Sequence, residues 1–381
     1  MNTVLILALA HASSARRLTL LRRAGNGFHP RVFSANRSGR GYDPRMNESK
    51  SSFERELAAL CPAPLRSGDV VRFVSPASPP TEEGVAHATE ILRSWGLRVQ
   101  LARNVFSRCP RLDYLAGTDE ERLADFNEAL RDPEVRAIIA TRGGKGAYRI
   151  ADKIDFAAAR ADPKFVVGFS EITILALWRQ CRLMGIHGAI AAQDATFDTS
   201  ATNDALRLVL MDGGPHILTS HSGEATSALT TKGNARGRLI GGNLDMVATS
   251  AGWTLPSLRG AILLLEAVNM GLGQVDRQLT MLANSGCVAE LAGVAIGQFT
   301  EFATGNRVLD VLGDHLSRWN VPVLGGLPLG HGPNPRTAIT GAIASLDADA
   351  ATLTLEVHSQ PDENSFKRTQ QGCGRTDLDR R

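Results

Sequence analysis

The chain has 381 residues, of which 43% are hydrophobic, 21% charged and 5% aromatic, and its formal net charge is +3. This composition fits a globular protein long enough for two domains, and it excludes a collagen-like, disulfide-rich or wholly disordered chain. Residues 1–42 hold seven arginines and no lysine or acidic residue, so the remaining chain carries +3 less 7, or −4. A mildly acidic body argues against a nucleic-acid partner.

The five cysteines are widely separated and include no CxxC pair: Cys61, Cys109, Cys181, Cys287 and Cys373. This spacing favours reduced thiols in a reducing compartment over a disulfide framework or a structural zinc site. The longest apolar run near the start, residues 4–10, is too short to span a bilayer, and no basic residue precedes it. The sequence therefore predicts a cytoplasmic protein that needs no metal or other cofactor and no membrane.

Residues 1–64 are rich in Arg, Ser, Gly and Asn without sustained periodicity, which is typical of a poorly ordered extension. Three explanations stay open: a true start further along the chain, for which Met46 is a candidate, a transit peptide, or a weak signal sequence. We favour the first because no cleavage-site pattern is convincing. Residues 359–381 mix charged residues with Gly and Gln and are expected to form a mobile tail.

Between residues 65 and 212, short apolar runs alternate with amphipathic segments. Thr81 followed by Glu82 and Glu83 is a helix-start signal, and Gly96 a stop signal. The patterns predict strands at 70–74, 97–101, 135–140 and 165–167, and helices at 81–95, 120–130 and 172–184. This alternation predicts an N-terminal α/β domain with a doubly wound, mainly parallel sheet, and functional groups at the carboxyl ends of its strands.

Residues 213–237 are rich in Gly, Ser and Thr, and we interpret them as the linker between two domains. Beyond them, residues 261–265 and 294–299 are short apolar runs, and 342–346 with 352–357 alternate like a hairpin. We therefore expect a smaller C-terminal α+β domain with mixed strands over residues 238–358.

Ser170 lies between an apolar strand and the start of a helix. A serine on such a turn can expose its hydroxyl as a nucleophile while the next N–H helps to bind an oxyanion, or it can simply cap the helix. The segment does not fit G-x-S-x-G, because Ile172 replaces the final glycine. The loop 142–146, Arg-Gly-Gly-Lys-Gly, can offer N–H groups and Lys145 to an anion, or serve as a plain turn.

A serine nucleophile needs a base, and the base needs an orienting acid. Of the nine histidines, His331 in Leu-Gly-His-Gly is the best placed, and His187 in Gly-Ile-His-Gly is its competitor in a similar loop setting. Taken alone, the loop setting of either one favours a structural histidine over a catalytic one. Glu266 ends the apolar run 261–265, so a carboxylate emerges at the tip of a buried strand, a position that solvated glutamates also occupy.

Seven motifs occur in one order across residues 68–357, and together the sequence resembles the serine peptidase family S66, specifically its L,D-carboxypeptidases. The motifs are Ser75-Pro-Ala-Ser78-Pro, Arg142-Gly-Gly-x-Gly146, Gly168-Phe-Ser170-Glu-Ile-Thr173, Ile240-Gly-Gly-Asn243-Leu244, Leu264-Leu-Glu266, Val275-Asp-Arg277-x-Leu279 and Pro328-Leu-Gly-His331.

The resemblance implies a triad of Ser170 as nucleophile, His331 as general base and Glu266 as its orienting acid. It implies oxyanion binding by the N–H groups of Gly144 and Glu171, an active site between the two domains, and a homodimer. The implied reaction removes a C-terminal D-alanine from muropeptides in cell-wall recycling. We expect substrate contacts from three further residues: Arg142, Lys145 and Asn243.

Four positions depart from the family's common pattern. Glu171 stands where aspartate is common, Lys145 replaces an aromatic residue, Ala267 replaces an acid, and Ala189 replaces the proline of a His-Gly-Pro segment. None of these is a position of the implied triad, so we expect them to change which substrate is bound rather than whether the protein is catalytically active.

Two alternatives stay open. The microcin-immunity branch of the same family cleaves peptide–nucleotide amides, and usually carries a longer segment between the serine and the glutamate, with an aromatic residue that stacks on the base. Here 96 positions separate Ser170 from Glu266, and only Trp253 is a plausible stacking residue, so the carboxypeptidase branch is preferred. A non-catalytic peptide-binding protein is the alternative from another class.

Overall fold

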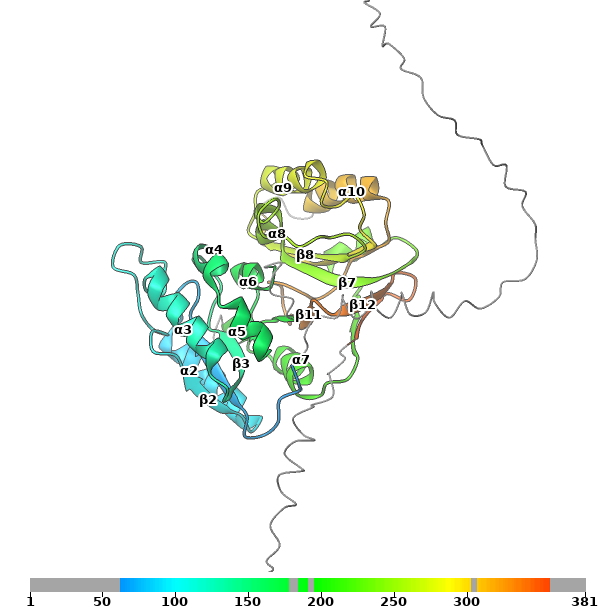
Figure 1. The fold of residues 1–381 in the computed structure, drawn as a ribbon. Helices are drawn as coiled ribbons and strands as arrows, with labels where there is room; N and C mark the ends of the chain where they lie inside the picture. Colours follow the sequence, from blue (N-terminus) through cyan, green and yellow to red (C-terminus); the bar gives the residue numbers. More distant parts are fainter. Residues whose placement is uncertain (1–61, 178–183, 191–194, 303–306, 357–381) are drawn as a thin grey trace, which may run out of the picture. The chain divides into compact units, whose positions relative to one another are not determined.

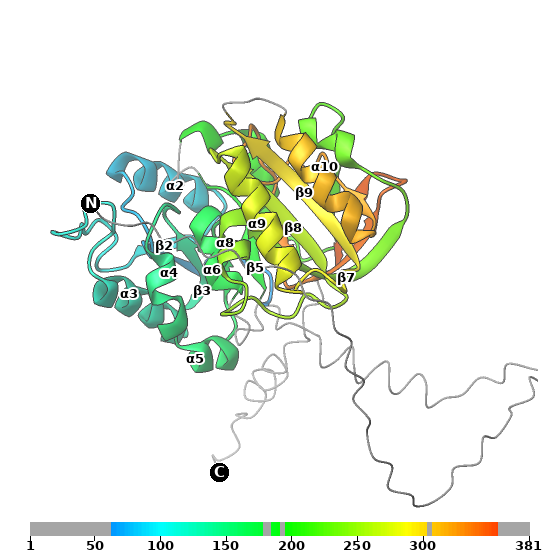
Figure 2. The ribbon, with the colours of Figure 1, turned by 90° about the horizontal axis from the view of Figure 1, so that it is seen from above.

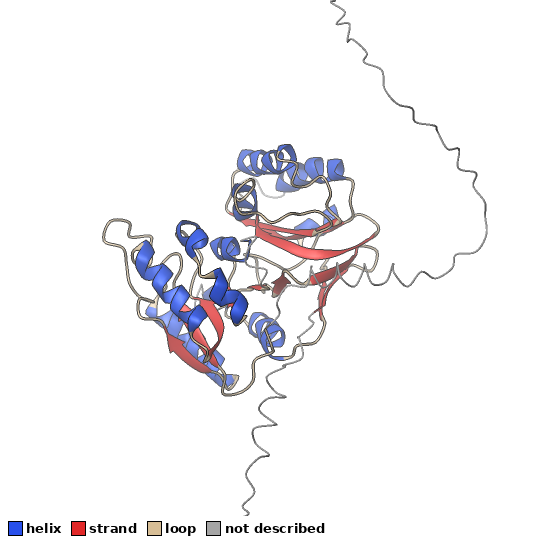
Figure 3. Cartoon of the chain, viewed as in Figure 1, coloured by secondary structure: helices blue, strands red, loops and turns tan. Residues whose placement is uncertain are grey.

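The computed structural model describes residues 62–177, 184–190, 195–302 and 307–356, all of which belong to one compact unit of the chain (Figure 1). The expected tail and most of the expected extension lie outside these residues. No helix in the described ranges is long and apolar enough to cross a membrane. The strands form a six-stranded sheet, β11-β5-β4-β3-β1-β2, and a seven-stranded sheet, β10-β9-β8-β7-β12-β13-β6 (Figure 3).

The six-stranded sheet is mainly parallel and has helices on both faces, as predicted. Its strands are β1 (Val70–Val74), β2 (Arg98–Leu101), β3 (Val135–Ala140), β4 (Phe165–Val167), β5 (Gly185–His187) and the antiparallel β11 (Ala338–Thr340). One face packs on α2 (Glu82–Ser94) and α7 (Ser200–Met211). The other packs on α3 (Asp119–Arg131), α4 (Ala147–Ile150), α5 (Phe156–Ala161) and α6 (Thr173–Leu177). Side chains alternate along each strand, so Val71 and Phe73 enter one core while Val70 and Val74 enter the other.

The helix-start signal at Thr81 acts as the sequence predicts, and a second start signal, which was not predicted, lies before α3. The Thr81 hydroxyl accepts the N–H of Gly84 at the start of α2, and Thr118 and Glu121 form a capping box at the start of α3. Of the helix predicted over 172–184, the structure confirms Thr173–Leu177 as α6. Residues 178–183 lie outside the described residues, and Met184 is not helical but directly precedes β5, which pairs with β4. The loop setting predicted for His187 is wrong, since His187 is the last residue of that buried strand.

The seven-stranded sheet combines parallel and antiparallel pairs, which confirms the expected mixed domain. The strands are β6 (His216–Thr219), β7 (Asn234–Asn243), β8 (Ile262–Val268), β9 (Gly293–Thr300), β10 (Val323–Leu324), β12 (Ile343–Asp347) and β13 (Thr352–Glu356). Strands β7 to β10 are parallel, and β12 and β13 form the predicted hairpin. Three helices pack on one face: α8 (Leu244–Thr249), α9 (Leu272–Asn284) and α10 (Arg307–Trp319) (Figure 2).

Regular structure occurs within the stretch that the sequence suggested as a linker. Residues 213–237 include β6, the 3₁₀ helix η4 (Ala225–Leu229) and the beginning of β7. Strand β6 is paired with β13 at the edge of the seven-stranded sheet, and a Gly- and Ser-rich composition did not reveal it.

One buried apolar cluster contains side chains from both sheets. It includes Val71 and Ile139 of the first sheet together with Leu264 and Ala295 of the second, and Leu329 from the segment before His331. Burial of this shared apolar surface is the main force that holds the two sheets together. Functional groups at the ends of strands in both sheets can therefore contribute to one site.

Candidate active site

Ser170 occupies a sharp turn between β4 and α6. Its φ of 60° lies in the left-handed region, which costs a side-chain-bearing residue about 1–2 kcal/mol, and the 3₁₀ turn η2 (Ser170–Ile172) begins at this residue. A Cβ on Gly143 would lie 2.8 Å from the Ser170 Cβ, so only glycine allows this close approach. The half-buried Ser170 side chain is thus held against the loop that follows β3.

That loop, residues 141–146, is fixed to the turn after β1. The Gly143 carbonyl accepts the N–H of Ser78 at 3.1 Å, and the Ser78 hydroxyl accepts the N–H of Lys145 at 3.0 Å. Within the described part of the chain, the N–H groups of Gly144 and Glu171 donate to no protein acceptor. Two backbone donors next to Ser170 are therefore available to a substrate oxygen.

The Glu171 side chain points away from solvent and accepts hydrogen bonds from the same loop. Its Oε1 accepts the N–H groups of Gly146 at 2.6 Å and Tyr148 at 3.1 Å, and only 5% of the residue is exposed. Burial raises the pKa of this carboxyl above its usual value, while the two N–H donors act in the opposite direction.

Glu266 lies within β8, two residues before its end, so the prediction that it emerges at the strand tip is wrong. It sits at an irregularity, where the pairing register with β9 shifts between Leu265 and Ala267. It is fully buried, and its Oε2 lies 2.7 Å from His331 Nδ1. Its Oε1 accepts the side-chain N–H of Asn243, the residue directly opposite it on β7, at 3.2 Å. Burial alone would raise the pKa of Glu266, but the charge and hydrogen bond of His331, with smaller contributions from His187 and Asn243, lower it below its usual value.

The segment carrying His331 packs closely on Glu266. A Cβ on Gly330, whose φ is +128°, would lie 2.8 Å from Glu266 Oε2, so this approach requires glycine. Gln298 at the end of β9 supports the other side, because its Oε1 accepts the Gly332 N–H at 2.8 Å and its amide donates to the Pro333 carbonyl at 3.2 Å. Sequence reasoning missed Gln298, which carries no local signal of this role.

Contacts between the two sheets bring the serine and histidine segments together. The rings of Phe169 and His331 have centroids 4.5 Å apart, and the Asn243 N–H donates to the Thr173 hydroxyl at 3.3 Å. No hydrogen bond joins the Ser170 hydroxyl to His331 among the described residues. Catalytic hydrogen bonds are often long before substrate binds and shorten in the complex.

His187 lies in the floor of the same site. Its ring meets Phe169 edge-on with centroids 5.9 Å apart, and its Nε2 has no partner among the described residues. Burial lowers the pKa of His187 to about 4, so this ring is neutral near pH 7. Its burial makes it a poor candidate for proton transfer with substrate.

Arg142 and Lys145 are exposed at the loop after β3, whereas Asn243 is 8% exposed and bonded to Glu266. A cavity of about 820 Å³ between α7 and β6 contains none of these groups. The described residues include no cluster of three or more His, Cys, Asp or Glu side chains suited to a metal ion. The groups near Ser170 that can take part in chemistry are the serine, histidine and glutamate side chains and the backbone N–H groups.

A buried glutamate bonded to a histidine, next to a strained serine on a strand-to-helix turn, is typical of a serine hydrolase. The chain belongs to the LD-carboxypeptidase family, peptidase family S66, and is a serine peptidase: the family's N-terminal domain matches residues 71–188 and its C-terminal domain matches residues 236–346.

Several relatives match most of the chain. A Streptomyces coelicolor protein named "putative carboxypeptidase" is 36% identical over 79% of this chain and 97% of its own length. The "probable murein peptide carboxypeptidase" of Bacillus subtilis is 32% identical over 77% of this chain and 94% of its own length. A solved structure of the microcin C7 self-immunity protein has the same fold, with a TM-score of 0.70, 23% identity, and coverage of 79% of this chain and all of that one.

Proposed function

We propose that this serine peptidase is an L,D-carboxypeptidase that hydrolyses the amide before a C-terminal D-alanine in muropeptides. The observation that carries the proposal is the 2.7 Å contact between His331 Nδ1 and the buried Glu266, beside a serine in left-handed backbone geometry. The name of the Bacillus subtilis relative supports a murein peptide as the substrate. Membership in a peptidase family removes the basis for the non-catalytic alternative.

In this mechanism Ser170 is the nucleophile and His331 is the base. Ionised Glu266 can only accept, so His331 carries its proton on Nδ1 and leaves Nε2 free to take the proton of the serine hydroxyl. The serine oxygen attacks the carbonyl carbon, and the oxyanion is bound by the N–H groups of Gly144 and Glu171. His331 then protonates the departing amine of D-alanine, and water hydrolyses the acyl-enzyme by the same steps in reverse order.

The three residues proposed to contact substrate differ in solvent exposure: Arg142 and Lys145 are exposed, and Asn243 is buried. Arg142 and Lys145 are exposed beside the oxyanion donors, where either cation could pair with the terminal carboxylate of a D-alanyl peptide. Asn243 donates to Glu266 and caps α8 through the Asp245 N–H, so we assign it chiefly to orienting the glutamate. The family resemblance further supports a cytoplasmic homodimer that acts in cell-wall recycling.

The test is hydrolysis followed by mass spectrometry, with an L,D-tetrapeptide, its all-L counterpart and an aminoacyl-nucleotide amide offered to wild type and Ser170→Ala. We expect D-alanine release from the L,D-peptide only, and none from Ser170→Ala. Preferential cleavage of the nucleotide amide would instead favour the microcin-immunity activity. The observation in favour of it is Trp253, which is 38% exposed and whose ring is tilted by 37° against that of Tyr148, with centroids 4.7 Å apart. Cleavage of none of the three would overturn the assignment.

A further inference from the structure

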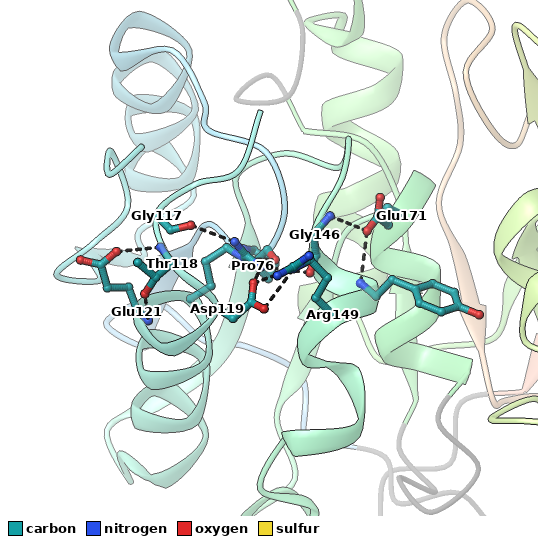
Figure 4. A network of polar contacts seen from close by, with 10 residues as sticks. Pro76, Gly117, Thr118, Asp119, Glu121, Gly146, Arg149 and Glu171 are labelled. Atoms are coloured by element: carbon teal, nitrogen blue, oxygen red, sulfur yellow. Dashed lines mark hydrogen bonds and ion pairs between the residues drawn. The ribbon is translucent and has the colours of Figure 1, made fainter. Parts of the chain in front are cut away.

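Gly146, the last glycine of the loop beside Ser170, is held on both sides by buried charged side chains (Figure 4). Its N–H donates to Glu171 Oε1 at 2.6 Å, and its carbonyl accepts from Arg122 Nη2 at 3.3 Å. Arg122 is charged, Glu171 accepts hydrogen bonds only from N–H donors, and hydrogen bonds to ionised groups are about twice as strong as neutral ones. The two peptide units on either side of the Gly146 Cα are therefore each restrained by another element, one by η2 and the other by α3.

Arg122 extends the same restraint to the turn after β1. Its side chain is completely buried, and it donates to the carbonyls of Pro76 at 3.1 Å and Gly117 at 2.9 Å while pairing with Asp119 at 2.6 Å. Pro76 lies two residues before Ser78, which binds the loop at Gly143 and Lys145. Loop and turn are thus fixed to a single buried guanidinium.

The loop requires such restraint because of its own sequence. Gly144 and Gly146 have φ values of +95° and +125°, and glycine loses more conformational freedom on folding than any other residue. A loop with three glycines in four positions has little intrinsic preference for one conformation. Hydrogen bonds from outside the loop must therefore select the geometry in which the Gly144 N–H lies beside Ser170.

We infer that Glu171 is a positioning residue, whose side chain, together with Arg122, fixes the loop 143–146 relative to Ser170 so that the Gly144 N–H is oriented toward the substrate oxyanion. The inference rests on the proposed function, in which that N–H is an oxyanion donor. One residue then serves twice: the Glu171 N–H faces the substrate, and the Glu171 carboxylate holds the second donor. Its carboxylate also occupies the N–H groups of Gly146 and Tyr148, so these do not compete for the oxyanion.

Two side-chain variants test the inference while leaving the Glu171 N–H in place. Glu171→Ala removes both hydrogen bonds, and Glu171→Gln keeps an oxygen acceptor without the charge. We expect kcat to fall about 100-fold in the first, as for loss of an oxyanion donor, and about 10-fold in the second, with KM within about threefold of wild type. Glu171→Asp, which restores the charge, should recover part of the loss in Glu171→Ala.

The matched control is Asp125→Asn. Asp125 is a buried carboxylate of the same domain that accepts two hydrogen bonds from Asn104, and burial raises its pKa as it does for Glu171. Because it contacts neither the loop nor Ser170 in any of its hydrogen bonds, we expect lower thermal stability with unchanged kcat. A loss of kcat in this control equal to that in Glu171→Gln would mean that the effect is general destabilisation, and would overturn the inference.

Hydrogen–deuterium exchange of the peptide covering residues 143–148 separates this inference from the proposed function. We expect faster exchange in Glu171→Ala and Glu171→Gln than in wild type, whatever the substrate. Unchanged exchange, or faster exchange with unchanged kcat, would overturn the inference even if wild type releases D-alanine. Faster exchange in a protein whose wild type cleaves no peptide would support the restraint on the loop and reject the proposed function.

Discussion

Replacement of Glu266 by glutamine tests the proposed base and its orientation. The side chain keeps its shape, and the Asn243 side-chain N–H, now 3.2 Å from Oε1, fixes which end of the new amide is the oxygen. The amide nitrogen of Glu266→Gln then faces His331 Nδ1, at the 2.7 Å position of the present oxygen. Because that nitrogen can only donate, Nδ1 must accept, and the ring proton moves to Nε2.

The expected loss is large because Nε2 is the atom that must take the serine proton. The wrong tautomer and the missing negative charge both oppose formation of the imidazolium, and the comparable change in another serine protease triad lowers kcat by about 10⁴. We expect a loss of about 10³–10⁴ in kcat, or roughly 4–5.5 kcal/mol of transition-state stabilisation. KM should change little, since Glu266 is fully buried behind His331.

The assay is the initial rate of D-alanine release over a range of substrate concentrations, with thermal unfolding measured in parallel. Glu290→Gln is the control, because Glu290 is an exposed glutamate paired with Arg259 on the surface. We expect wild-type kcat from the control and a folded but nearly inactive Glu266→Gln. A folded Glu266→Gln that retains kcat within about tenfold of wild type would refute the assignment of Glu266 and His331 as an acid–base pair.

Three further outcomes follow from local geometry and burial. Ser170→Gly and Ser170→Ala should both be inactive, but Ser170→Gly should be about 1 kcal/mol more stable in urea unfolding, because only glycine is unstrained at a φ of 60°. Equal stabilities of the two variants would refute the backbone strain at this position. Gly330→Ala should lose about 1–3 kcal/mol of stability and most of its kcat, since the new Cβ would lie 2.8 Å from Glu266 Oε2. A crystal structure of Gly330→Ala in which His331 has not moved would contradict the expected loss of kcat. The folded pKa of His187, about 4, lies below the ordinary 6.5, so the unfolded chain binds the proton more tightly than the folded protein does. The full free energy of unfolding is therefore present above pH 6.5 and should fall by roughly 3 kcal/mol as the pH drops toward 4. His187→Asn should remove that part of the pH dependence of unfolding, and identical pH profiles would reject it.

Much of the fold could be predicted from local patterns, because its longer elements have strong signals. The strand at 135–140 and the helix beginning after Thr81 appear where apolar spacing and capping residues predict them. The proposed triad residues also lie at recognisable positions: Ser170 follows an apolar strand, Glu266 follows an apolar run within β8, and His331 lies between two glycines. These signals are short-range: they identify where a helix, strand or site residue lies, but not which distant segment it contacts.

The elements that sequence reasoning missed depend on distant pairing. Strands β5 and β11 are only three residues long, too short to show a period, and they pair with each other across about 150 positions of the chain. Gln298 is recognisable only once the His331 segment is seen to pack on β9. In the same way, the sequence placed the Glu171 backbone at the site, but its side-chain role requires the loop 25 residues earlier to fold against it.

The arrangement of the site makes the proposed chemistry depend on how the two sheets pack. Ser170 and the loop 143–146 follow strands of the six-stranded sheet, whereas Glu266 lies on the seven-stranded sheet and His331 follows β10. Contacts between the two groups include the Phe169–His331 rings and the hydrogen bond from Asn243 to Thr173. The apolar cluster shared by both sheets supplies the larger force, and it includes Leu329, two residues before His331. The distance between the serine and the histidine is therefore set by burial of apolar side chains, and the hydrogen bonds orient groups that this packing has already brought together.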